Sequence, residues 1–139
     1  MSAASNYLEN KVLDHVLRTA SYTQPSGLWL ALFNNTSGSA ATNLEAGTLT
    51  DETSTSGTAY VRKAVTFAAS SSGTAATSAT VTFDAATANW GTISHVAIMD
   101  GATAGAGNVL FWGAVTTPKT IETGDTFQVT SGNLTVSLA

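Results

Sequence analysis

One apolar run in the second half of the chain limits the possible folds more than any other segment. Trp90 and Gly91 lead into residues 93–100, which are apolar at nearly every position and end at the turn signal Asp100-Gly101. A strand sends alternate side chains to opposite faces of a sheet, so a strand without polar alternation is buried on both faces. We therefore expect residues 93–100 to lie in the middle of a packed β structure.

Further short strands are predicted on both sides of this run. Residues 28–33 form a second continuous apolar strand, and we expect both of its faces to be covered, one of them by the N-terminal helix predicted at residues 6–20. The other predicted strands are residues 60–67, 79–84, 109–115, 120–122, 126–129 and 134–138, with residues 68–78 as a link of small residues. We expect 93–100 to pair with 109–115 as an antiparallel hairpin, and 120–122 to pair with 126–129.

The number and spacing of these strands predict the fold class. About seven or eight short strands separated by turn signals are typical of a mainly β fold, namely a β-sandwich that is jelly-roll-like, Ig-like or barrel-like. Within residues 60–67, Val61 and Val65 are expected on one face and Arg62 on the other. The 139 residues suit a single domain, 1–139, and no internal repeat or boundary divides them.

A short N-terminal α-helix is predicted at residues 6–20. Asn6 is placed to cap its N-terminus, with Glu9 three residues later as in a capping box. Asp14 and Arg18 are spaced to form an ion pair four residues apart. One stripe of apolar residues recurs at helical spacing: Leu8, Val12, Leu13, Val16, Leu17 and Ala20. An amphipathic helix packs on a sheet or on a partner, and the sequence leaves open whether its own domain or a neighbour provides that surface.

The longest polar stretch, residues 34–57, is rich in Ser, Thr and Gly. Long loops in compact domains are usually functional, so we interpret residues 34–57 as a contact arm. Trp90 is expected to be partly exposed at the start of its strand and is added to the contact set. The candidate partner-contact residues are Asn34, Asn35, Asn43, Glu45, Asp51, Glu52 and Trp90.

The charge content indicates what kind of partner the surface suits. Charged residues make up 10% of the chain, against about 25% in an ordinary soluble domain. Charged residues are depleted at the cores of interfaces, so this composition suits a protein that works in an assembly. A net charge of −4 argues against nucleic-acid binding, which needs a basic face.

Two further sequence features indicate the cellular compartment in which the protein is expected. No apolar run approaches the ~18 residues of a membrane-spanning helix. The N-terminal region also lacks a basic segment followed by an apolar one, so no secretory signal is visible. We expect a protein that does not act in a membrane and that stays in the cytosol until it is assembled.

Few side chains are available for chemistry. The chain has no cysteine, which removes thiol nucleophiles and Cys-type zinc sites. His15 and His95 have no spacing that suits a metal, and Gly101–Gly107 precedes a strand where a phosphate loop would precede a helix. The remaining candidate acids lie at strand ends or turns, where they hydrogen-bond locally: Asp84, Asp100, Glu122 and Asp125. We predict no enzymatic activity, no catalytic residue, no metal site and no cofactor.

The tryptophans raise the possibility of sugar binding, because exposed aromatic rings stack on sugar rings. Trp29 and Trp112 lie within apolar strands and are predicted to be core residues. Trp90 could instead form a carbohydrate platform. A carbohydrate-binding module therefore remains a possible function, ranked below those that follow.

Several ordered blocks resemble a family of small tailed-bacteriophage virion structural proteins, whose members are often labelled tail-fibre-like. The blocks cover essentially the whole chain: residues 8–17, 28–33, 60–67, 90–101 and 110–115, with Pro118-Lys119 and Gly124-Asp125. The resemblance implies a place in the virion and leaves the position within the particle open. It supplies no catalytic residue.

Within such a particle we rank a capsid decoration, or cement, protein first, because long fibre shafts show repeats or extended segments that this chain lacks. A compact domain with a contact arm at residues 34–57 better suits a plug fitted onto an existing shell. It would bind and stabilise the head shell. A tail or tail-fibre-associated structural or adhesion protein ranks second. The expected partners are the major capsid protein or other virion proteins and further copies of the chain, as a homo-oligomer for which we assume a trimer. The sequence leaves head or tail position, oligomer number and host open.

Overall fold

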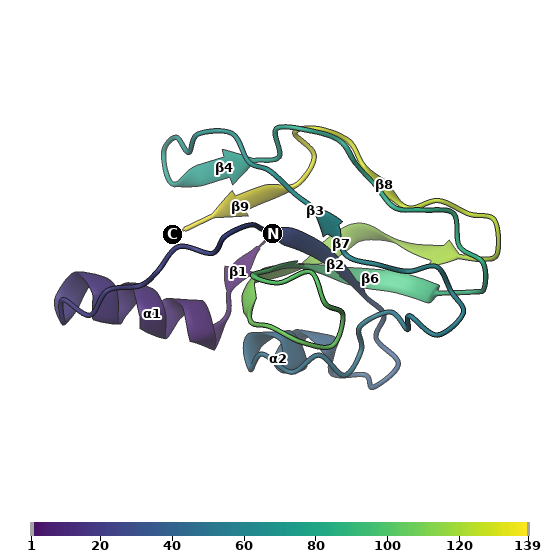
Figure 1. Ribbon diagram of the computed structural model, residues 1–139, viewed down its shortest axis with the longest axis horizontal. Coiled ribbons are helices and arrows are strands. Elements are labelled where there is room, and N and C mark those ends of the chain that lie inside the picture. The colour runs from purple at the N-terminus through teal and green to yellow at the C-terminus, as the bar shows by residue number, and fades with distance from the viewer. Residues whose placement is uncertain (1, 139) are drawn as a thin grey trace.

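The computed structural model describes residues 2–138 and places the apolar run in the interior of a five-stranded antiparallel sheet (Figure 1). The strands lie in the order β1 (Ala3–Ala4), β7 (Val109–Ile121), β6 (Gly91–Met99), β2 (Trp29–Phe33) and β3 (Lys63–Ala64). β6 pairs with β7 as the predicted hairpin and with β2 on its other side. The expected central position of this run is therefore confirmed.

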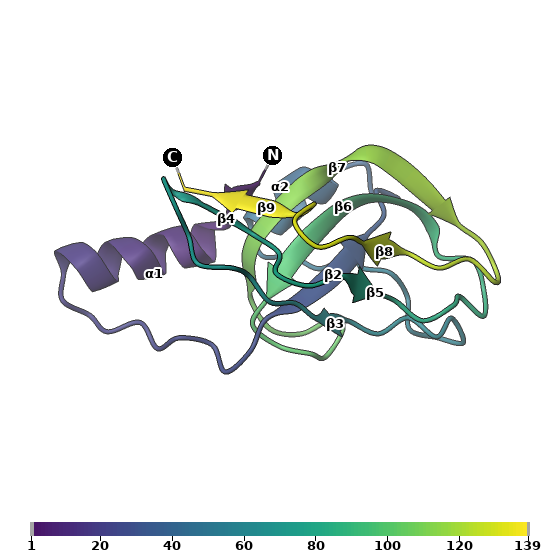
Figure 2. The same cartoon turned by 90° about the horizontal axis from the view of Figure 1, so that it is seen from above.

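Two small sheets lie over one face of the large sheet (Figures 1 and 2). One pairs β4 (Thr74–Ala76) with β9 (Thr135–Ser137), and the other pairs β5 (Val81–Thr82) with β8 (Gln128–Val129). The main core lies between the layers, and its aromatic centre is formed by Tyr60, Phe83, Trp90 and Phe127. The arrangement is mainly β and sandwich-like, as the spacing of the strands predicts.

A second core covers the opposite face of the large sheet. Leu30 and Leu32 of β2 face the main core, while Ala31 and Phe33 face the second. The helix that covers this second face is α2 (Ala40–Glu45), whose Leu44 is fully buried. Both faces of β2 are thus covered as expected, but the covering helix is α2 and not the N-terminal helix predicted at residues 6–20. The segment 34–57, predicted as an open loop, contributes a helix and part of a core.

The N-terminal helix α1 spans Asn6–Leu17, so it is shorter than predicted. Its cap is Ser5 rather than Asn6: the Ser5 hydroxyl accepts a hydrogen bond from the Leu8 amide at 3.3 Å and donates to the Val109 carbonyl of β7. The helix ends at Leu17 because Thr19 adopts a left-handed φ of 56°, which α-helical backbone cannot contain.

The C-terminal third pairs differently from the prediction. β7 continues to Ile121, and the next strand, β8, pairs with β5 instead of folding back on residues 120–122. Residues 68–78, predicted as a link, contain β4, and β4 pairs with β9. The turn signal at residues 123–125 favours a local hairpin. Strand β8 pairs with the distant strand β5 instead, because Phe127 and Val129 are then buried against the main core.

The edges of the large sheet are protected. Both outermost strands, β1 and β3, are two residues long. The exposed end of β7 carries Pro118 and Lys119, residue types that oppose pairing with a further strand. Lys63 lies on edge strand β3, and its ammonium group is 2.8 Å from the Asp84 carboxylate. These edges do not offer a ready site for strand addition.

Candidate functional site

The acids that could have formed a catalytic pair are engaged locally. Asp84 is paired with Lys63, and Asp100 accepts hydrogen bonds from the amide and side chain of Asn108, each at 2.7 Å. Asp125 accepts from the Glu122 amide at 2.9 Å, closing a turn. Within residues 2–138, no three His, Asp or Glu side chains are grouped as a metal would require.

The two histidines lie on different elements and have structural partners. His15 Nδ1, on α1, accepts a hydrogen bond from the Tyr22 amide at 3.1 Å. His95, on β6, lies 2.9 Å from the Ser94 hydroxyl. Burial lowers the pKa of His95, although Asp51 opposes the shift, so the ring is neutral at pH 7.

Residues 34–57 are held together internally by a buried carboxylate, that of Asp51. Asp51 is 2% exposed and accepts hydrogen bonds from the Ser37 amide at 3.0 Å and the Thr36 hydroxyl at 3.2 Å. Burial alone would raise the pKa of Asp51, but hydrogen bonds from Ser37 and its neighbours outweigh burial and lower it. The Asp51 carbonyl also accepts from the Asn34 amide at 3.0 Å. Asp51 therefore organises this segment internally.

Glu52 forms a buried ion pair with Arg62. The guanidinium donates to the two carboxylate oxygens at 2.7 and 2.8 Å, and the two side chains are 4% and 0% exposed. The same guanidinium donates to the carbonyls of Gly101 and Ala106, at 2.8 and 2.9 Å. One arginine thus joins residues 34–57 to the loop between β6 and β7.

Tyr60 and Gly105 complete the hydrogen bonding of Glu52. The Tyr60 hydroxyl donates to Glu52 at 3.0 Å and accepts from the Leu32 amide at 3.0 Å. Burial and the Glu52 carboxylate raise the pKa of Tyr60 well above its ordinary value, so the phenol keeps its proton. The Gly105 amide donates to Glu52 at 2.7 Å. With four internal donors directed at the carboxylate, Glu52 has little capacity for an external partner.

The other predicted contact residues also make internal bonds. Trp90, expected to be partly exposed, is 4% exposed, and its indole donates to the Thr58 carbonyl at 2.8 Å. Glu45 accepts from the Trp112 indole at 2.8 Å, and Asn35 accepts from the Ala40 amide at 2.9 Å at the start of α2. The Asn34 side chain accepts a hydrogen bond from the Thr36 amide, and the Asn43 side chain donates one to the Ser37 hydroxyl. Of the seven predicted residues, only Asn35 is exposed, and the others are half-buried or buried.

Sequence reasoning missed Arg62, which it placed on the face opposite Val61. The structure reverses these positions: Arg62 is 5% exposed and Val61 is 49% exposed. An arginine within an apolar run is a signal for a buried ion pair. The sequence does not say which acid is its partner.

The apolar stripe of α1 is mostly exposed. Leu8 packs on the body, but the stripe beyond it does not. We call Val12, Leu13, Val16 and Leu17 the helix patch. Their exposed fractions rise from 37% at Val12 to 74% at Leu17. The predicted amphipathic helix is therefore present, and its own chain does not cover most of its apolar face.

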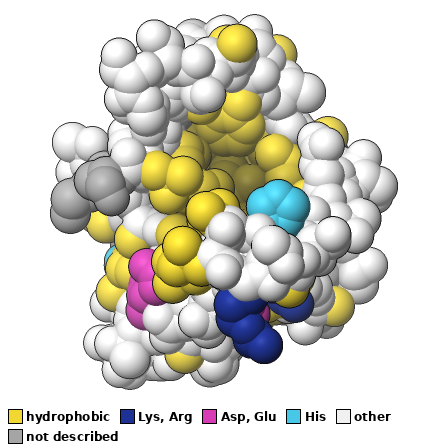
Figure 3. Space-filling model, turned by 90° about the vertical axis from the view of Figure 1, so that its left-hand side faces the viewer, with side chains coloured by type: hydrophobic (Ala, Val, Ile, Leu, Met, Phe, Trp, Pro, Cys, Tyr) yellow, Lys and Arg dark blue, Asp and Glu magenta, His cyan; other side chains and the backbone are white. Residues whose placement is uncertain are grey.

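An apolar groove opens at the same end of the molecule. It has a volume of about 260 Å³ and lies between the large sheet and the β4–β9 pair. Figure 3 views the molecule from this end and shows hydrophobic side chains lining a hollow. We call it the end groove; its apolar lining residues are Leu28, Phe67, Ala75, Ile98, Leu110, Phe111, Val136 and Leu138.

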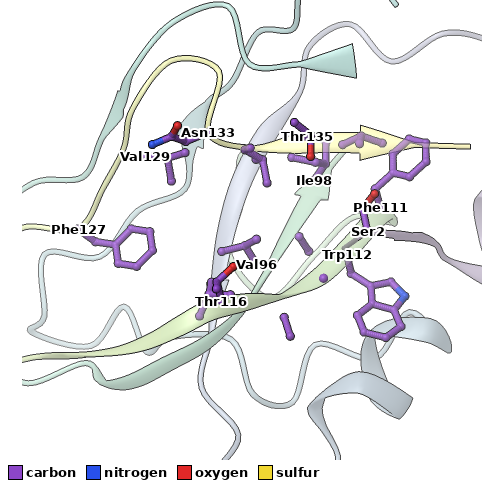
Figure 4. A pocket seen from close by; sticks show the side chains of 16 residues that line it. Ser2, Val96, Ile98, Phe111, Trp112, Thr116, Phe127, Val129, Asn133 and Thr135 are labelled. Carbon is purple, nitrogen blue, oxygen red and sulfur yellow. The ribbon is translucent and has the colours of Figure 1, made fainter. Parts of the chain in front are cut away.

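A second cavity of about 270 Å³ lies beside the end groove (Figure 4). Its lining includes the side chains of Val96, Ile98 and Phe127 together with those of Thr116 and Asn133, so it is part apolar and part polar. No charged side chain lines it. It has the character of a small binding cleft and offers no general acid or base.

The comparisons with known proteins identify the family. Residues 3–137 match the family described as Podophage GP4 fiber I protein gp80. No curated protein matches the chain. The helices among residues 2–138 are too short and too polar to cross a membrane. Because the match covers almost the whole chain, this chain belongs to the family of the podophage GP4 fiber I protein gp80, a family of phage virion structural proteins.

Proposed function

We propose that this protein is a structural subunit of a phage fibre or of the fibre's attachment to the tail. The observation that carries this proposal is the match of residues 3–137 to a family described as a fibre protein. The sequence ranked capsid decoration first and a tail-fibre role second. The family match favours the second of these.

The structure also weakens the reason for ranking decoration first. That ranking relied on residues 34–57 reaching across a capsid as an arm. Instead, Asp51 holds the segment together internally, Glu52 ties it to Arg62, and α2 covers the second core. A segment held by buried hydrogen bonds is not free to extend toward a partner without losing them.

We further propose that the protein acts by binding and not by catalysis. The carboxylates of Asp51, Glu52 and Asp100 all accept internal hydrogen bonds, and Glu52 accepts four. A general acid or base must instead reach a substrate with a free lone pair or proton. The two cavities are lined by apolar and neutral polar side chains.

Locating the protein on the particle tests the fibre role. Purified virions would be labelled with gold-conjugated antibodies against this chain, and its copy number would be measured by mass spectrometry against the major capsid protein. We expect label at the tail or fibres and a copy number far below that of the capsid protein. Label spread over the head at a comparable copy number would restore the decoration role, and absence from virions would reject both.

A further inference from the structure

The exposed large apolar side chains of this protein are concentrated at one end of the molecule. Among the described residues, four of the six belong to the helix patch and a fifth, Leu138, is 60% exposed at the end groove. Only Val61 lies elsewhere. Single exposed apolar residues are normal, but a contiguous set marks an interaction surface.

The total surface area points in the same direction. A monomeric protein of 14.1 kDa is expected to expose roughly 6,700 Å². This chain exposes 7419 Å². The excess of about 700 Å² is close to the ~800 Å² that each partner buries in a standard-size interface. α1 contributes to this excess because it projects beyond the body (Figures 1 and 2).

We propose that the helix patch of α1 docks into the end groove of a second copy of this chain. This self-association deepens the proposed fibre role, although solution experiments test it separately. Both surfaces are mostly apolar. Lys11 and Arg18 lie on the opposite side of the helix, whereas Glu9, three and four residues before Val12 and Leu13, lies at the N-terminal end of the patch side. Docking removes the apolar surface of the helix patch from water, and it buries no unpaired charge when the Glu9 carboxylate stays at the solvent-exposed rim of the contact.

A second copy is the favoured occupant because the chain's own helix is held away from its groove. No α1 residue lines the groove. Ser5 fixes the start of the helix to the Val109 carbonyl, and Leu8 is buried against the body. Swinging the helix patch into the groove of the same chain would disrupt both contacts. A neighbouring copy can meet the helix as it stands.

The symmetry of such a contact follows from its two different surfaces. Helix and groove lie at the same end of each molecule, so copies can exchange helices as a two-fold pair or join head-to-tail in a closed ring. Either form satisfies every helix patch and every groove. A closed assembly would also leave the protected sheet edges at the periphery.

The first test measures oligomeric state in solution. Light scattering coupled to size exclusion should show the purified full-length chain as an oligomer. Leu17→Asp and Leu138→Asp should each shift it toward the monomer, because each places a charge in the contact. Both positions are exposed, at 74% and 60%, so folding should survive, as circular dichroism can verify. Lys11→Asp, on the opposite side of α1, is the matched control and should leave the oligomer intact.

The second test identifies the contact itself, using the absence of cysteine from the chain. Leu17→Cys and Thr74→Cys would be purified separately, mixed and oxidised. We expect the disulfide-linked heterodimer of these two variants to exceed both homodimers, and Lys11→Cys mixed with Thr74→Cys to give little product. Thr74 is an exposed residue of the groove lining, so a thiol introduced there would be accessible.

Four results would overturn the proposal. They are a wild-type monomer at all concentrations, an oligomer unaffected by Leu17→Asp, a dominant Leu17→Cys homodimer, and an intrachain disulfide in a variant that carries both Leu17→Cys and Thr74→Cys. The third would indicate helix-to-helix pairing and the fourth docking within one chain. All these measurements use purified protein, so a failure of the self-association proposal would not contradict the proposed fibre location. In the same way, finding the protein on the head would not contradict self-association measured in solution.

Discussion

At the residue scale, the Arg62–Glu52 pair joins segments that are distant in sequence. Arg62 contacts Glu52, Gly101 and Ala106, so one side chain links residues 34–57 to the loop between β6 and β7. The pair is buried and, within residues 2–138, no buried side-chain donor or acceptor is left without a partner. Complete hydrogen bonding is the condition under which a buried ion pair is tolerated.

Replacing Glu52 by Gln should therefore destabilise the fold strongly. The Arg62 charge would remain buried without compensation, and we expect a loss of about 3–5 kcal/mol in the free energy of unfolding. Urea denaturation measures this difference. Asp84→Asn is the control: it breaks the exposed Lys63 pair and should change stability by less than about 1 kcal/mol. Equal effects of the two substitutions would contradict the structural role of the buried pair.

Asp51 should make stability depend on pH. Its pKa is lowered in the folded state, so the unfolded chain binds the proton more readily. The stabilisation is then fully present above an unfolded pKa of about 3.9 and is lost as the pH falls through the lower folded value. Denaturation between about pH 2 and 6 should show this loss in the wild type. In Asp51→Asn the acid-dependent loss should be smaller, and an unchanged profile would contradict the assignment.

At the element scale, α1 is anchored at one end and exposed along the rest. Ser5 is fully buried and serves both as the helix cap and as a bond to β7. α2 is the opposite case, because its Leu44 is fully buried in the second core. The helix that the sequence pattern predicts is thus the less buried of the two.

The position of the cap can be tested by two neighbouring substitutions. Ser5→Ala removes a buried hydroxyl and a cap, and we expect a loss of about 1–2 kcal/mol. Asn6→Ala changes an exposed first-turn residue and should remain within about 0.5 kcal/mol. Thermal and urea unfolding of both variants measure these values. A larger effect at Asn6 would restore the cap predicted from the sequence.

At the scale of the whole molecule, the fold is a sandwich-like body with an apolar helix and an apolar groove at one end. If copies associate through these two surfaces, each copy acts as a ligand that binds only the native state of its neighbour. Association then raises the stability of the native state by mass action. The melting temperature of the wild type should then rise with protein concentration. That of Leu17→Asp should stay constant, which differential scanning calorimetry over a concentration series can check. A wild-type melting temperature independent of concentration would contradict this coupling.

The sequence alone determined the features that depend on local pattern. Residues 93–99 had to be a doubly buried strand because they lack polar alternation, and residues 6–17 had to be an amphipathic helix because their apolar residues recur at helical spacing. The antiparallel hairpin of β6 and β7 follows from two apolar runs joined by a glycine-rich turn. Low charge and the family resemblance also predicted a virion protein, and the family match over residues 3–137 confirms it.

Tertiary structure decided which distant segments meet. β8 pairs with β5, β9 pairs with β4, and Glu52 pairs with Arg62, because each partner is chosen by the burial it permits and not by a nearby turn. Residues 34–57 look like a loop because their polar side chains satisfy one another and the backbone, while only Ala40, Leu44 and Leu49 reach the core. Whether an apolar stripe is covered likewise depends on the packing of the whole chain, which leaves α1 exposed and α2 buried.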